Sequence, residues 1–126
     1  MQANFWVIPR QHSMNGTAGS DSITWRSKYG SLVITAYDSG VVDGVNEAGL
    51  AANILYLSES DYGDLRGRPP LTVSAWASFV LDNYGTVEEA VEKLRREPFR
   101  IVAPVDARTG RRVNVHLAIS DRGGDR

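Results

Sequence analysis

The polar groups best placed for chemistry stand inside one apolar stretch, residues 50–57. Its sequence, LAANILYL, carries Asn53 and Tyr56, an amide and a phenol in a segment composed for burial. An unpaired buried amide costs about 1–3 kcal/mol, so Asn53 should have a hydrogen-bond partner. We expect a structural role for it, tying the strand backbone to a neighbouring turn. Tyr56 taken alone is an ordinary core residue of a strand.

The other candidate groups favour structural or solvent-facing roles. His12 and His116 are far apart and have no partner at a metal-ligand spacing, so we expect no metal site. Glu88, Glu89 and Glu92 occupy exposed or capping positions of a helix. The chain has no cysteine, which removes thiolate nucleophiles and thiolate metal sites. No local motif makes these 126 residues a self-contained enzyme.

Length and composition predict one domain, residues 1–126, with a modest core. The chain is 42% hydrophobic and 23% charged, which is ordinary for a globular protein. Its net charge of -1 gives no field that would attract nucleic acid or an anionic membrane. No apolar run approaches the roughly 20 residues of a membrane helix. We therefore expect neither nucleic acid nor membrane as a partner.

Hydrophobic alternation predicts strands, and tight turns separate them. The strands are expected at residues 5–8, 23–29, 31–38 and 50–57. Gly30 should turn the second of these into an antiparallel pair with the third, whose β-branched run suggests cover on both faces. Residues 39–44 are expected to be a short connection, and residues 46–49 a tight turn.

The second half of the sequence predicts two helices and two more strands. Apolar residues recur at three- and four-residue steps over residues 73–84, which indicates an amphipathic helix. Thr86 and Glu89 form a capping box that should begin a second helix. Strands are expected at residues 99–107 and 112–120, joined by a hairpin around Thr109 and Gly110. The polar run 58–70 should be a surface loop. This order is α+β, with two helices packed on antiparallel sheets.

Four segments resemble one known family in their order and spacing: WRSKYGSLVITAYD, DGVNEAGLAANILYLSESDYG, AWASFVLDNYGTVEEAVEKL and VHLAISDRGGD. The chain resembles the choloylglycine hydrolases, the penicillin V acylases and conjugated bile salt hydrolases of the N-terminal-nucleophile (Ntn) hydrolase superfamily. The N-E-x-G-L-A-x-N signature of residues 46–53 carries most of this likeness. The resemblance implies an αββα sandwich, of which this chain would be an incomplete, internal part.

The resemblance also implies a reaction and roles for three residues. Family members hydrolyse linear amides with an N-terminal cysteine, which this chain lacks, so we expect the chain as given to be inactive. Tyr56 falls where relatives place an oxyanion-hole residue, with its backbone N–H toward the oxyanion and its ring in the acyl pocket. Val41 and Val42 fall on the rim of that pocket. Asn46 and Asn53 are expected to be structural polar residues.

The implied substrates are amides such as penicillin V, N-acyl homoserine lactones or conjugated bile salts, with no cofactor or metal. The tyrosine favours aryloxyacetyl or fatty-acyl amides over bile salts. A homo-oligomer and a periplasmic location are further expectations from the resemblance. Two alternatives stay open: a non-catalytic remnant or interaction module with the same sheet, and an unrelated α+β binding domain.

Overall fold

The computed structural model describes residues 3–36, 40–56, 67–103, 110 and 115–124. Nine strands and two helices lie within these ranges. The elements are, in chain order, β1 Ala3–Ile8, β2 Ser13–Asn15, β3 Thr24–Arg26, β4 Ser31–Ala36, β5 Gly40–Asn46, β6 Ala51–Tyr56, β7 Pro70–Thr72, α1 Val73–Asn83, α2 Val87–Leu94, β8 Arg100–Val102 and β9 Val115–Ser120.

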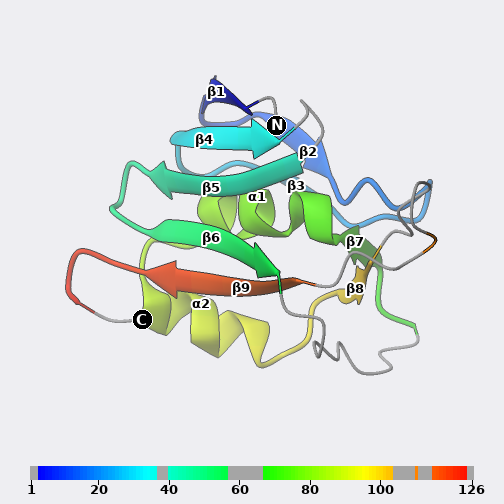
Figure 1. Cartoon of the computed structure of the whole chain (residues 1–126). Helices are drawn as coiled ribbons and strands as arrows, with labels where there is room; N and C mark the ends of the chain where they lie inside the picture. Colours follow the sequence, from blue (N-terminus) through cyan, green and yellow to red (C-terminus); the bar gives the residue numbers. More distant parts are fainter. Residues whose placement is uncertain (1–2, 37–39, 57–66, 104–109, 111–114, 125–126) are drawn as a thin grey trace.

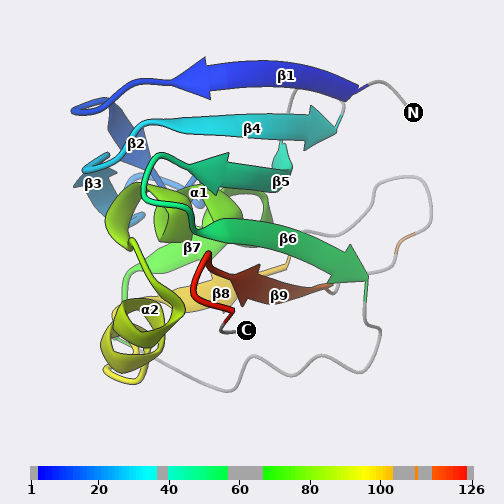
Figure 2. The same ribbon diagram turned by 90° about the vertical axis from the view of Figure 1, so that its left-hand side faces the viewer.

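A five-stranded antiparallel sheet in the order β1-β4-β5-β6-β9 is the main element of the fold. Both helices lie on one side of it (Figures 1 and 2). Two short sheets, β2-β3 and the parallel pair β7-β8, complete the described fold. The α+β class with antiparallel sheets and two helices is therefore confirmed. No helix in the described ranges is long and apolar enough to cross a membrane.

The core lies between α1 and the inner face of the main sheet. Val33, Leu50, Leu71, Val80 and Leu81 are fully buried there. In the adjoining cluster the Phe79 ring makes edge-to-face contacts with three other rings, at centroid distances of 5.1, 6.0 and 5.0 Å to Trp25, Tyr84 and Phe99. The contacts with Trp25 and Phe99 fix α1 against β3 and the residue before β8.

The outer face of the main sheet is apolar and open. Val7, Leu32 and Val45 stand in register across β1, β4 and β5, and Phe5 stands two residues from Val7 on the same strand. Phe5 is 71% exposed, Val7 77% and Leu32 45%. The expectation that the strand at residues 31–38 is covered on both faces is therefore wrong for this chain. Only the face that meets α1 is buried.

The predicted strand at residues 23–29 is shorter than expected, and its predicted pairing with the strand at residues 31–38 is wrong. The segment 23–29 keeps only three residues in β3, which pairs with β2, while β4 pairs with β1 and β5. The physical reason is Ser27, which is buried and uses its hydroxyl to donate to Pro9 O and to accept from His12 N. These bonds take the segment out of a ladder with β4.

Residues expected to be a short connection form β5 instead. Glycine has a low strand propensity, but Gly44 sits under α1, where an added Cβ would lie 2.8 Å from Leu81 Cδ1. Packing of the helix on the sheet thus overrides the local preference. The turn at residues 46–49 is confirmed, with Gly49 at φ +95° and its N–H bonded to Asn46 O.

The described parts of the two C-terminal strands pair with other strands of the chain. β8 pairs in parallel with β7, and β9 pairs with β6. Residues 104–109 and 111–114 lie outside the described residues, so the turn around Thr109 is not placed. Most of the predicted surface loop at residues 58–70 also lies outside them, although its last residue, Pro70, begins β7. A first strand position tolerates proline because no ladder N–H is needed there.

Candidate functional site

The signature turn after β5 is held by a buried asparagine. Asn46 is 5% exposed, and its Nδ2 donates to Leu81 O at 2.9 Å and to Tyr84 O at 2.7 Å. Its Oδ1 accepts from the N–H groups of Ala48 and Leu50, each at 3.0 Å. One side chain therefore satisfies two carbonyls at the end of α1 and two amides of the β5–β6 turn.

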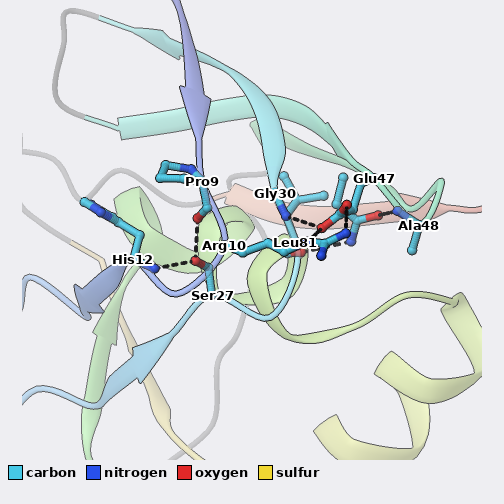
Figure 3. A network of polar contacts seen from close by, with 9 residues as sticks. Pro9, Arg10, His12, Ser27, Gly30, Glu47, Ala48 and Leu81 are labelled. Atoms are coloured by element: carbon cyan, nitrogen blue, oxygen red, sulfur yellow. Dashed lines mark hydrogen bonds and ion pairs between the residues drawn. The ribbon is translucent and has the colours of Figure 1, made fainter.

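The glutamate of the signature forms a second tie at the same end of the sheet. Glu47 pairs with Arg10 through both carboxylate oxygens and also accepts from Gly30 N at 2.8 Å (Figure 3). The Arg10 hydrogen bond, helped by the Gly30 N–H, lowers the pKa of the Glu47 carboxyl to about 2. These contacts join the end of β1, the loop before β4 and the β5–β6 turn. Asn46 and Glu47 of the signature thus hold the β5–β6 turn to its neighbouring elements.

A buried carboxyl connects α1 to the β2-β3 hairpin. Asp82 is 1% exposed and accepts from Trp25 Nε1 at 2.8 Å. Burial raises the pKa of the Asp82 carboxyl to about 6, and the Trp25 hydrogen bond and the charge of His12 oppose the rise. The position near the helix C-terminus also disfavours a negative charge. The Asp82 carboxyl therefore binds its proton more tightly in the folded state than in the unfolded state.

The raised pKa of Asp82 predicts a pH-dependent stability. Protonated Asp82 contributes stability that is fully present below the unfolded pKa near 3.9 and is lost as the pH rises through about 6. This loss lowers the free energy of unfolding by roughly 2 kcal/mol. Asp82→Asn keeps an acceptor for Trp25 and should remove this dependence, which urea denaturation between pH 4 and pH 8 would measure. The Glu47 carboxyl titrates at lower pH and is common to both proteins. Equal slopes in the two proteins would contradict the assignment.

β5 and β6 form a fork rather than a continuous pair. Their ladder runs from Val45↔Ala51 to Asp43↔Asn53. Beyond that step β5 stays with β4, β6 stays with β9 as far as Tyr56, and Figures 1 and 2 show the two strands diverging. The main sheet thus divides at Asp43↔Asn53 into two ladders.

The predicted rim residues lie on one arm of this fork. Ile34 pairs with Asp43 and Thr35 with Val41, which leaves Val42 as the extra residue of a β-bulge. Bulges bend a strand and recur beside active sites. Val41 packs against the buried cluster under α1, as Ile54 does from the other arm. No local pattern predicts this bulge, because the residue types of this segment favour a connection.

The alternation of backbone direction places the Tyr56 N–H on the open side of β6. Asn46 N donates to Leu50 O, so the Leu50 backbone faces β5. Every second residue of a strand points its N–H and C=O the same way, which directs Ile54 and Tyr56 toward β5 as well. Both lie beyond the last β5–β6 pair, Asp43↔Asn53. The Tyr56 ring lies outside the described side chains.

Asn53 has a partner different from the one expected. Its Nδ2 donates to Asp43 Oδ1 at 2.7 Å, across the last paired step of β5 and β6. The bond joins two strands through side chains and involves no turn backbone. Asp43 could not be predicted as this partner, because the register of β5 and β6 cannot be read from the residue types.

The histidines and acidic residues considered in the sequence form no metal site in the described ranges, because no three such side chains converge there to hold an ion. His116 lies on β9 opposite Leu55 of β6, one residue from Tyr56, whereas His12 lies in the loop after β1. Two surface hollows of about 490 and 530 Å³ lie along the β2-β3 hairpin and beside the start of α2, and neither is lined by Val41 or Val42.

Comparison with known proteins gives a consistent family. The model of the linear amide C–N hydrolases, choloylglycine hydrolase family, matches residues 1–126. Penicillin V acylase of Pectobacterium atrosepticum is 42% identical over 132 residues, which cover 98% of this chain and 35% of that protein. The chain thus spans about a third of the length of this curated relative.

Solved structures show the same likeness in three dimensions. Penicillin V acylase from Agrobacterium tumefaciens superposes with a TM-score of 0.82 at 48% identity, covering 94% of this chain and 35% of that one. A variant of conjugated bile acid hydrolase from Clostridium perfringens gives 0.67 at 29% identity, covering 97% and 38%. The chain therefore belongs to the linear amide C–N hydrolases of the choloylglycine hydrolase family.

Proposed function

We propose that this chain is the part of a linear amide hydrolase that supplies an oxyanion-hole donor and one wall of the acyl pocket. The donor is the Tyr56 backbone N–H, and the wall is formed by Val41 and Val42. The observation that carries the proposal is the fork, because it leaves the β5-facing N–H of Tyr56 beyond the last β5–β6 pair.

The proposed reaction divides the work between this chain and a nucleophile that it lacks. A cysteine thiolate attacks the carbonyl carbon of the amide, and the carbonyl oxygen becomes an oxyanion that accepts from Tyr56 N–H. The C–N bond then breaks, the amine leaves with a proton, and water hydrolyses the acyl-enzyme. A donor fixed in place before the reaction stabilises this charge without reorganisation.

The proposed substrates are amides with an aryloxyacetyl or fatty-acyl group, of which penicillin V is the example. Two penicillin V acylases are 42% and 48% identical to the chain, against 29% for the bile acid hydrolase variant. Whether the whole protein is a homo-oligomer in the periplasm stays a prediction, and we propose no metal or cofactor.

The open outer face supports the proposal that residues 1–126 are an incomplete part of a larger domain. Phe5, Val7, Leu32, Val45 and Leu55 are large apolar side chains exposed on that face. Apolar patches of this kind mark surfaces that pack against something else. We propose that the second sheet of an αββα sandwich covers them in the whole enzyme.

Two proteins test the proposed function. The 126-residue chain alone should not hydrolyse penicillin V, because it has no cysteine. A chimera in which it replaces the aligned third of the Agrobacterium acylase should hydrolyse it, as measured by release of phenoxyacetate. A folded chimera without turnover would favour the non-catalytic module instead. Turnover by the chain alone would refute the proposal that the nucleophile comes from outside it.

A further inference from the structure

The side-chain bond between Asp43 and Asn53 stands at the branch point of the main sheet. It joins the last paired residues of β5 and β6, and Tyr56 follows three residues later on β6. The two side chains project from the outer face, since Asp43 alternates with exposed Val45 and Asn53 with exposed Leu55. No described element covers them from that side.

The backbone alternation makes this step suited to a side-chain lock. Asn46 N donates to Leu50 O, so the bonded pairs of this ladder are Asn46↔Leu50 and Gly44↔Ala52. Asp43↔Asn53 is therefore a non-hydrogen-bonded pair, in which opposite Cα atoms approach to about 4.5 Å and side chains come closer. The backbone supplies no bond here, and the side chains supply one at 2.7 Å.

Beyond this step each strand keeps a different partner. β5 continues along β4 with the bulge at Val42, and β6 remains paired with β9 through Tyr56↔Val115. The position at which β5 and β6 separate therefore depends on the interaction that joins their last paired residues. A charge-assisted hydrogen bond is stronger than a neutral one and is well suited to set it.

We propose that the Asp43–Asn53 hydrogen bond is a lock that fixes where β5 and β6 separate, and so positions the Tyr56 N–H; its catalytic meaning rests on the proposed function. Asp43 and Asn53 are positioning residues that act through β6. Loss of the bond should loosen the Gly44↔Ala52 pair and change the orientation of the Tyr56 amide. The Asn46 end of the hairpin should be unaffected, because it has its own ties to α1.

A charge swap in the labelled 126-residue chain tests the lock without any turnover. Asn53→Asp places two carboxylates opposite each other and should speed hydrogen exchange of the Gly44 and Ala52 amides about tenfold. The residual dipolar coupling of the Tyr56 N–H should change with it. Asp43→Asn combined with Asn53→Asp rebuilds the pair with exchanged partners and should restore both readings.

Controls separate the lock from general destabilisation. Ser120→Asp adds a carboxylate on the same face opposite Ala51, away from the branch point, and should leave both readings unchanged. Asn53→Ala removes the bond without repulsion and replaces Asn53→Asp if that variant does not fold. Unchanged exchange and coupling in the Asn53 variants, or no recovery in the swap, would overturn the proposal.

The chimera then separates the lock from the proposed function. Loss of the lock there should lower kcat more than it raises KM, because an oxyanion donor acts in the transition state. An inactive chimera with a swap-restored lock would refute the function and keep the lock. An active chimera whose kcat is insensitive to the lock would refute the positioning role.

Discussion

Asn46→Ala is expected to lower the free energy of unfolding by about 3 kcal/mol or more. The change leaves the carbonyls of Leu81 and Tyr84 and the amides of Ala48 and Leu50 without the partner they have now. Each buried polar group left unpaired costs about 1–3 kcal/mol, and relaxation or entering water offsets part of the sum. Urea denaturation followed by circular dichroism measures the difference.

Asn83→Ala is the matched control for this loss. Asn83 lies two residues after Leu81, is partly buried, and makes one described bond through its amide nitrogen, to Phe79 O. Alanine also favours the helix in which Asn83 stands. Its substitution should therefore cost much less than that of Asn46. Equal losses in the two variants would show that Asn46 is no more than an ordinary helix-end contact.

The helices were predictable because their signals are local. The three- and four-residue steps that predicted a helix at 73–84 correspond to α1, Val73–Asn83. Thr86 Oγ1 accepts from Glu89 N at the start of α2, as the capping box implies, while the Glu89 carboxylate reaches Gly85 N instead of Thr86 N. Such signals depend on residues three or four apart, so they can be recognised without knowing the tertiary partners.

The sheet was harder to predict because its partners are distant in sequence. The glycines of β5 argued for a connection, and only the approach of Leu81 to Gly44 explains why a strand passes there. The bulge at Val42 and the Asp43–Asn53 bond likewise follow from the registers of three strands. Residue types showed that Asn53 needed a partner, and the fold decided which one.

Tyr56→Pro in the chimera is expected to lower kcat/KM for penicillin V by about 10²–10³-fold, the usual effect of losing one oxyanion-hole donor. Proline has no N–H, and the alternation along β6 directs this N–H away from β9. The pairing Tyr56↔Val115 therefore loses no ladder bond. Proline also keeps Leu55 extended, as β6 requires. The loss should fall on kcat.

Tyr56→Phe separates the backbone donor from the side-chain hydroxyl. Phenylalanine keeps the N–H and the aromatic ring and removes only the hydroxyl, so it should retain most of the activity. Both variants must first give the same thermal unfolding as the parent chimera. This comparison excludes a general loss of folding as the cause of a low rate.

The most direct test of the proposed donor is kcat for penicillin V in the parent, Tyr56→Phe and Tyr56→Pro chimeras, measured on folded protein at saturating substrate. The fork predicts near-parental kcat for Tyr56→Phe and a loss of about 10²-fold or more for Tyr56→Pro. A folded Tyr56→Pro chimera with parental kcat would contradict the claim that the Tyr56 N–H holds the oxyanion.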